Sequence, residues 1–157
     1  MNISNHISYV EVTRSDMAKR LGISNIPSVE QLENIKILAE KVFEPIREHF
    51  NVPVYISSFF RSKELNKKLK GASSSQHLAN NGAAMDIDAD IFGGITNKEI
   101  FNYIKDHLGF DQLILENVSS DGTGGWIHCS YVDEDKNRNQ VLIMTIKNGK
   151  KYYEKYV

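Results

Sequence analysis

Hydrophobic residues recur at helical spacing in two segments of the chain. Ser28 and Gln31 form a capping-box pair, and apolar residues follow them at every third or fourth position. This pattern predicts a long packing helix that ends near Asn51, with a kink at Pro45. A second amphipathic helix is predicted over residues 96–108.

Shorter runs of β-branched and aromatic residues predict strands between turn signals. The predicted strands are residues 7–12, 52–60, 110–116, 126–132, 140–147 and 151–156. Asn148 and Gly149 are a strong two-residue turn signal between the last two strands. Short helices are expected at residues 15–21 and 62–69. The order of these elements favours an α+β fold with a central antiparallel sheet flanked by helices.

Length, composition and charge narrow the class of protein. With 157 residues and no repeat or linker, the chain is expected to form a single domain over residues 1–157. The net charge of -1 gives no support to a nucleic-acid partner. The N-terminus does not resemble a secretory signal and no apolar run approaches about 20 residues. We therefore expect synthesis in the cytoplasm without a signal peptide, and no stable membrane insertion.

The candidate chemistry centres on residues 73–90. Here His77 and Asp86 lie on either side of an Asn-Asn-Gly turn, which lets the chain double back. Strand alternation places Asp86 on the face opposite the apolar residues Ala83, Met85, Ile87 and Ala89. His128 lies in a later predicted strand, so one antiparallel sheet can bring Asp86 and His128 side by side, with His77 entering from the turn.

Two histidines, an aspartate and the separate Glu116 are the residues of a zinc hydrolase. Three protein ligands leave a fourth position for water, and a glutamate can accept that water's proton. The spacing alone is not diagnostic, because each residue taken singly is also common in structural roles. The other histidines (His6, His49 and His107) are interpreted as surface or satisfied residues, and Cys129 as a buried thiol.

Several ordered motifs resemble one family, the zinc D-alanyl-D-alanine carboxypeptidases and related peptidoglycan peptidases, which share a fold with the hedgehog signalling domain. The motifs are Ser75-Gln76-His77, Gly82-Ala83-Ala84-Met85-Asp86, a strand that ends at Glu116, and Trp126-Ile127-His128. Upstream, Ser58-Phe59-Phe60-Arg61-Ser62 is similar to the family's Ser-Gly-Tyr-Arg-Ser segment. The similarity spans about residues 52–132.

The resemblance implies a hedgehog/DD-peptidase-like fold and a role for each matched residue. One Zn²⁺ ion would be held by His77, Asp86 and His128, with Glu116 as the general base. Arg61 would anchor or polarise the substrate, and Ser75 would line the substrate cleft.

Two departures from the family pattern affect the expected site. Asn80 and Asn81 look like an insertion, which we place in the turn, so that Asp86 stays the ligand and Asp88 is the alternative. Phe59 stands where the family commonly has glycine, and it is expected to reshape the cleft beside Arg61.

The implied function is hydrolysis of a peptide bond in the stem peptide of bacterial peptidoglycan, by carboxypeptidase or endolysin-type endopeptidase action. Small members without a signal resemble phage or prophage lysis proteins, which reach the cell wall after a holin-like partner permeabilises the membrane. The alternative is an inactive metal-binding or cell-wall-binding module, such as a component of a phage particle. Glu116 favours the enzyme, because a purely structural zinc site needs no general base.

Overall fold

The computed structural model describes residues 1–157 and contains helices, strands and one π-helical segment. In chain order the elements are β1 (Asn2–Ser4), β2 (Ile7–Ser8), α1 (Tyr9–Thr13), α2 (Asp16–Leu21), α3 (Val29–Leu38), the π-helix η1 (Ala39–Phe43), α4 (Glu44–Phe50), β3 (Tyr55–Ser58), α5 (Lys63–Lys68), the 3₁₀ turn η2 (Gln76–Leu78), β4 (Ala83–Asp88), α6 (Asn97–His107), β5 (Gln112–Glu116), β6 (Trp126–Tyr131), β7 (Gln140–Lys147) and β8 (Lys150–Lys155). This α+β content confirms the predicted fold class. None of the helices has the length and apolar character needed to span a membrane.

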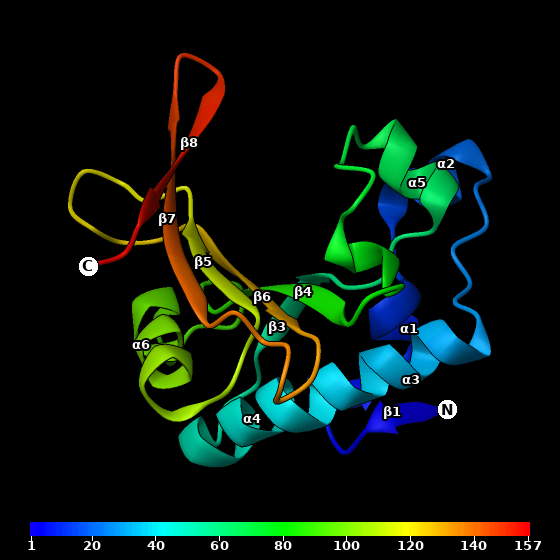
Figure 1. The fold of residues 1–157 in the computed structure, drawn as a ribbon, viewed down its shortest axis with the longest axis horizontal. Helices are drawn as coiled ribbons and strands as arrows, with labels where there is room; N and C mark the ends of the chain where they lie inside the picture. The colour runs from blue at the N-terminus through cyan, green and yellow to red at the C-terminus, as the bar shows by residue number, and fades with distance from the viewer.

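A six-stranded sheet with the order β3-β4-β6-β5-β7-β8 organises the molecule (Figure 1). All neighbouring strands are antiparallel except β5 and β7, so the sheet is mixed where a fully antiparallel one was expected. The topology explains the parallel pair. Strand β6 pairs with β4 on one side and with β5 on the other, so β7 pairs with the free edge of β5. Both β5 and β7 run opposite to β6, and they are therefore parallel to each other.

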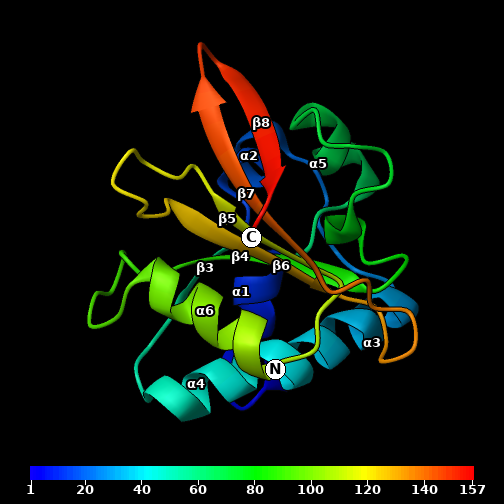
Figure 2. The same ribbon diagram turned by 60° about the vertical axis from the view of Figure 1, so that its left-hand side comes forward.

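Helices cover one face of this sheet and leave the other face open (Figure 2). The continuous α3-η1-α4 segment and α6 pack against the apolar side chains of β4, β5 and β6. Met85, Ile87 and Cys129 are fully buried there, as strand alternation predicts. Full burial of an aliphatic side chain contributes about 1.5–3 kcal/mol, so the helical face accounts for much of the stability.

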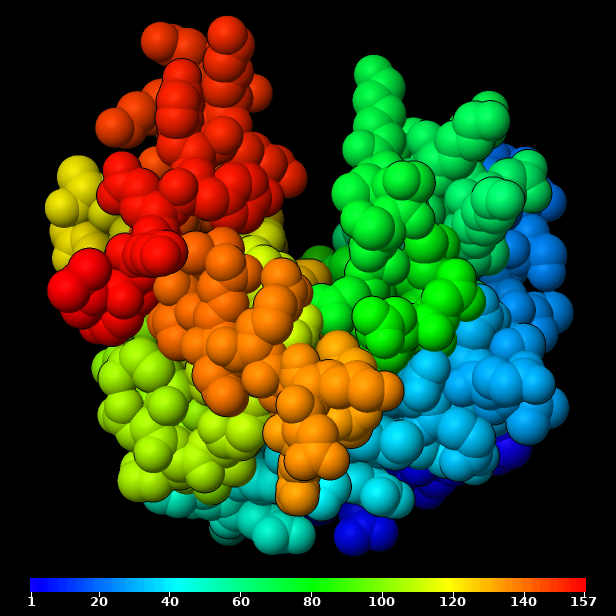
Figure 3. Space-filling model, in the orientation of Figure 1, coloured from blue at the N-terminus to red at the C-terminus, as the bar shows by residue number.

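The open face is hollowed into a cleft. In the space-filling view the cleft lies between the β7–β8 hairpin, coloured orange to red, and the green segment of α5 and η2 (Figure 3). Its volume is about 790 Å³. The residues on the open side of the sheet therefore face solvent at the floor of this cleft.

The long predicted helix is present but irregular. Its Ser28–Gln31 capping box forms as expected. The irregularity is a π-helical turn over Ala39–Phe43, directly before Pro45. Proline has no N–H to donate to the preceding turn, and a π-turn lets the helix continue past that missing hydrogen bond.

The predicted strand at residues 7–12 is wrong beyond its first two residues. Only Ile7 and Ser8 extend, and helix α1 begins at Tyr9. Ser8 and Glu11 form a second capping box, in which each side chain accepts the other's backbone N–H. This local hydrogen bonding outweighs the β-branched character of the segment.

Gly82 is required by a close backbone approach where the chain enters β4. Its φ is +69°, and a Cβ there would lie 2.1 Å from the carbonyl oxygen of Tyr131 on β6. Any larger residue would push β4 away from β6 at the start of their ladder. Because Asp86 and His128 are partners along this ladder, Gly82 also helps to keep these two side chains at their positions on the open face.

We predict that Gly82→Ala destabilises the protein by about 2 kcal/mol or more, because a clash adds to backbone strain. Gly93→Ala is the matched control, since Gly93 has φ +72° but open space around its Cβ position. The control should cost about 1 kcal/mol from backbone strain alone. Denaturant unfolding of both variants measures the difference, and equal losses would contradict the proposed close contact.

Candidate active site

His77 is fixed by two hydrogen bonds that join η2 to the segment after β3. Its Nδ1–H donates to the carbonyl oxygen of Phe59 at 2.7 Å, and its own carbonyl accepts from the backbone N–H of Arg61 at 2.9 Å. A carbonyl oxygen can only accept, so the ring proton resides on Nδ1. The lone pair of Nε2 therefore points at Asp86 Oδ1, 3.4 Å away.

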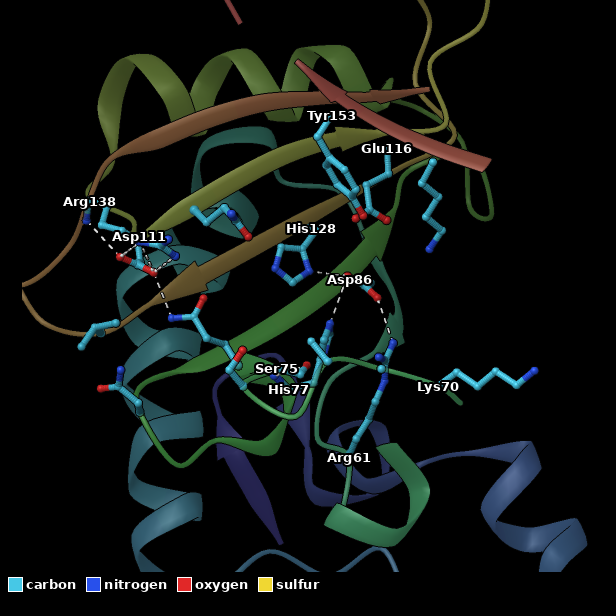
Figure 4. Close-up of a pocket in the computed structure, with 18 of the residues that line it drawn as sticks. Arg61, Lys70, Ser75, His77, Asp86, Asp111, Glu116, His128, Arg138 and Tyr153 are labelled. Atoms are coloured by element: carbon cyan, nitrogen blue, oxygen red, sulfur yellow. Dashed lines mark hydrogen bonds and ion pairs between the residues drawn. The ribbon is translucent and has the colours of Figure 1, made fainter. Parts of the chain in front are cut away.

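Asp86 and His128 are brought together by strand register. They are directly opposite partners on β4 and β6, and Asp86 Oδ1 lies 3.0 Å from His128 Nδ1 (Figure 4). The predicted alternation is thus confirmed. The ring centroids of His77 and His128 are 5.1 Å apart. Both imidazoles contact the same carboxylate oxygen, Asp86 Oδ1.

The three side chains fit a zinc ion. Their ligand atoms all lie within 4.8 Å of one another. In a tetrahedral zinc site with ligands at about 2.0–2.1 Å, neighbouring ligand atoms are about 3.3 Å apart. The 3.0 and 3.4 Å separations around Asp86 Oδ1 match this value. A lone pair that faces a carboxylate oxygen is repelled by it, and an ion bound between the two atoms would relieve this repulsion.

Burial and charge favour the metal-binding forms of His77 and Asp86. Burial lowers the pKa of His77 and keeps its imidazole neutral, although the Asp86 charge opposes this. Burial alone would raise the pKa of Asp86, but the two imidazoles outweigh it and hold that pKa well below its usual range. A neutral imidazole and an ionised carboxylate are the states in which these groups act as ligands. For His128, burial lowers the pKa but Asp86 outweighs it and raises that pKa, so metal binding there has to displace a proton.

Glu116 ends β5 beside this cluster and is held by a tryptophan. It is the cross-strand partner of Trp126, whose Nε1–H donates to Glu116 Oε2. Burial raises the pKa of Glu116, and the negative charge of Asp86 raises it further. A raised pKa makes a carboxylate a better proton acceptor near neutral pH, as a general base requires.

Arg61 and Ser75 lie where the sequence motif places them, at the edge of the cleft. Arg61 Nη2 is 3.5 Å from Asp86 Oδ2, and Arg61 Nε donates to the Ser58 hydroxyl. Ser75 accepts the backbone N–H of His77 through its Oγ and so caps the 3₁₀ turn. Both residues therefore support the cluster structurally, and their contact with substrate stays a prediction.

The structure shows that neither departure from the family pattern changes the metal-binding cluster. Asn80 and Asn81 lie in the turn before β4 and leave Asp86 in place, whereas Asp88 accepts a hydrogen bond from Asn97 and is not in the cluster. The Phe59 side chain is buried in the core and does not line the cleft, contrary to expectation. Only its carbonyl reaches the site.

Sequence reasoning missed several polar residues of the cleft. At one end, buried Asp111 accepts hydrogen bonds from Gln76 and from the Arg138 guanidinium. At the other end, Lys151 and Tyr153 of β8 line the cleft. Asp111 could be found in the sequence only as part of the predicted strand that ends at Glu116. Lys151 and Tyr153 reach the cleft through pairing between distant strands, which no sequence motif indicates.

The remaining predicted residues lie outside the cluster. His6 pairs with Glu44, and His49 and His107 lie in the last turns of α4 and α6. Cys129 is a fully buried thiol, as predicted, and burial raises its pKa.

Two histidines and a carboxylate at a polar cleft, with a separate glutamate beside them, define a mononuclear metallohydrolase site. The Peptidase M15 family model matches residues 5–130, which is most of the chain. The chain therefore belongs to this family, and it is a metallopeptidase by that membership. No curated protein matches the sequence. Zinc dependence is a property of the family, and the cluster of His77, Asp86 and His128 is the group that could hold the metal.

We predict that His77→Ala, Asp86→Asn and His128→Ala each abolish stoichiometric zinc binding, because two protein ligands hold zinc poorly. Zinc content of the purified variants, measured by plasma mass spectrometry, checks this. Asp88→Asn is the control and should keep one zinc per chain, since Asp88 bonds to Asn97 outside the cluster. Loss of zinc from the control but not from Asp86→Asn would mean that Asp88 is the ligand.

Proposed function

We propose that this protein is a zinc-dependent peptidase that hydrolyses a peptide bond in the stem peptide of bacterial peptidoglycan. The observation that carries the proposal is the position of Glu116, which lies beside the three-ligand cluster and is held there by Trp126. Family membership supports the peptidase chemistry. A metal site of purely structural use would have no need of an oriented carboxylate at its edge.

His77, Asp86 and His128 would hold the ion, which supplies a Lewis acid and leaves a position open to the cleft. Glu116 would accept a proton from the attacking water and return it to the leaving amine. Trp126 orients the carboxylate through its indole N–H, so that one oxygen stays free for this transfer. The Phe59 carbonyl fixes the tautomer of His77 and keeps Nε2 available as a ligand.

The cleft itself favours a polar and anionic substrate. Only three of its 19 lining residues are hydrophobic. Five lysine and arginine side chains face three carboxylates in this lining, and a bound ion would add further positive charge. Stem peptides carry several free carboxylates and few large apolar groups, which suits such a surface. Arg61, which lines the cleft beside Asp86, is positioned to bind a substrate carboxylate or a developing oxyanion.

We propose that the protein acts on the cell wall as a lysis enzyme of endolysin type, with a holin-like partner for release or within a phage particle. The small catalytic unit and the open polar cleft support action on an extended polymer. Whether it acts as a carboxypeptidase or an endopeptidase depends on what the cationic residues of the cleft bind.

We predict that Glu116→Ala retains zinc and lowers the rate of cleavage by about 10²–10⁴-fold, the range for loss of a general base. The assay is digestion of purified peptidoglycan with mass analysis of the released fragments. Glu154→Ala is the control, because this exposed glutamate lies on the far face of the same sheet. Its activity should equal that of the wild type.

Fragment masses from the wild type also name the bond that is cut. Zinc-loaded wild type that releases nothing from walls of several chemistries would contradict the proposed activity. Such a result would favour a wall-binding module that keeps the metal site without turnover.

A further inference from the structure

We propose that strand β8 supplies two substrate-binding residues. Lys151 binds a free α-carboxylate on the substrate residue that leaves as the amine, and Tyr153 contacts the substrate beside Glu116. This inference rests on the proposed function and adds the determinant of its specificity. The match to the family model ends at residue 130, before the β7–β8 hairpin begins, so the match assigns no role to either residue.

The register of the sheet places both side chains on the open face. Leu115 of β5 pairs with Ile143 of β7, so the next residue along, Met144, lies alongside Glu116. Met144 in turn pairs with Tyr153. Paired residues project from the same face of a sheet, so Tyr153 belongs to the same cross-strand row as Glu116. Lys151 follows two positions away on the same face.

The close-up agrees with this register. Tyr153 projects from β8 toward Glu116 above the Asp86 and His128 pair (Figure 4). Both Tyr153 and Lys151 line the cleft with the metal cluster. Burial raises the pKa of Tyr153, and the charges of Glu116 and Asp86 raise it further, which places the phenol within electrostatic reach of both carboxylates. Its side chain still has half its surface exposed, so it can meet a ligand.

Lys151 differs from the arginines of the cleft in having no partner. Arg61 is paired with Asp86, and Arg138 is paired with Asp111. Lys151 forms no ion pair or hydrogen bond within the protein through its side chain. Its positive charge nevertheless acts on Glu116, lowering that carboxyl's pKa against the larger effect of burial. An unpaired ammonium beside the general base is suited to bind an anionic group of the substrate.

The position of Lys151 defines which carboxylate it binds. Glu116 returns a proton to the leaving amine, so it lies beside the residue that departs. A carboxylate that reaches Lys151 must therefore belong to that residue. In a lysine-type stem peptide two residues offer a free α-carboxylate next to a peptide bond: the C-terminal D-alanine and the γ-linked D-glutamate. Carboxypeptidase action uses the first, and endopeptidase action before D-glutamate uses the second.

The hairpin also offers matched controls of the same residue types. Lys150 and Tyr152 neighbour Lys151 and Tyr153 in sequence but project from the opposite face and do not line the cleft. All four side chains are exposed, so none of the substitutions removes a core contact.

The test uses zinc-loaded protein and the peptide L-Ala-γ-D-Glu-L-Lys-D-Ala-D-Ala, with each of the two α-carboxylates in turn free or amidated. Wild type should prefer the free acid over the amide at one of the two positions, and that position names the source of the carboxylate. Lys151→Gln should raise KM for the preferred peptide about tenfold or more and abolish the preference. Tyr153→Phe should lower kcat/KM for acid and amide peptides alike, by about tenfold.

A binding measurement separates recognition from turnover. In the Glu116→Gln background, calorimetry with the free-acid peptide should show about tenfold weaker binding when Lys151→Gln is added. Adding Lys150→Gln should leave the affinity unchanged. The Lys150→Gln and Tyr152→Phe variants in the wild-type background should keep normal KM and kcat.

The experiments distinguish failure of this inference from failure of the proposed function. If wild type cleaves the peptide or the intact wall, yet shows no acid preference or keeps it in Lys151→Gln, the inference is overturned and the peptidase proposal stands. If wild type with stoichiometric zinc cleaves neither peptide nor wall, the proposed function fails, and the inference fails with it.

Discussion

The cross-strand pairing of Asp86 with His128 is the constraint on which the site depends. These residues are direct partners on two central strands, so their separation is set by the backbone ladder rather than by flexible side chains. A slip of one residue in β4 against β6 would turn the Asp86 side chain into the helical layer and away from His128. Gly82 allows the ladder to begin, because its backbone approaches Tyr131 more closely than a Cβ would permit. The relative position of these two candidate metal ligands is thus fixed by the sheet.

The third ligand reaches the site by a different route. His77 lies on a 3₁₀ turn outside the sheet, and its position depends on hydrogen bonds to the segment after β3. Helix α3 supports the far side of this turn, since Gln31 and Asn34 donate to the carbonyls of Leu78 and Ala79. The position of the His77 imidazole therefore depends on the 3₁₀ turn, on the capped helix α3 and on buried packing below the sheet. The two extra residues in the turn are tolerated because these anchors precede them.

Local signals in the sequence predicted most of the elements, and the motifs that resemble the family pointed to the residues that the structure brings together as a possible metal site. The Ser28–Gln31 capping box and the Asn148–Gly149 turn mark features that form as expected, because short-range hydrogen bonds and backbone preferences decide them. Period-two alternation was sufficient to place Asp86 and His128 on one face once β4 and β6 were assumed to pair, and the structure adds the register that makes them direct partners.

Features that depend on long-range pairing could not be predicted in this way. The parallel contact of β7 with β5 follows from which sheet edges remain free, and this is a property of the whole topology. The places of Lys151 and Tyr153 in the cleft follow from that contact. Likewise, the hydrogen bond from Trp126 to Glu116 needs the β5–β6 register, although the strand motif already contained both residues.

The central claim is that His77, Asp86 and His128 bind one zinc ion in a site open to the cleft. The most direct measurement is X-ray diffraction at the zinc absorption edge from crystals of the zinc-loaded protein. We predict a single anomalous peak about 2.0–2.2 Å from His77 Nε2, Asp86 Oδ1 and His128 Nδ1, with Glu116 beside it but not bound to it. A peak elsewhere, or a fourth protein ligand that closes the site, would contradict the account.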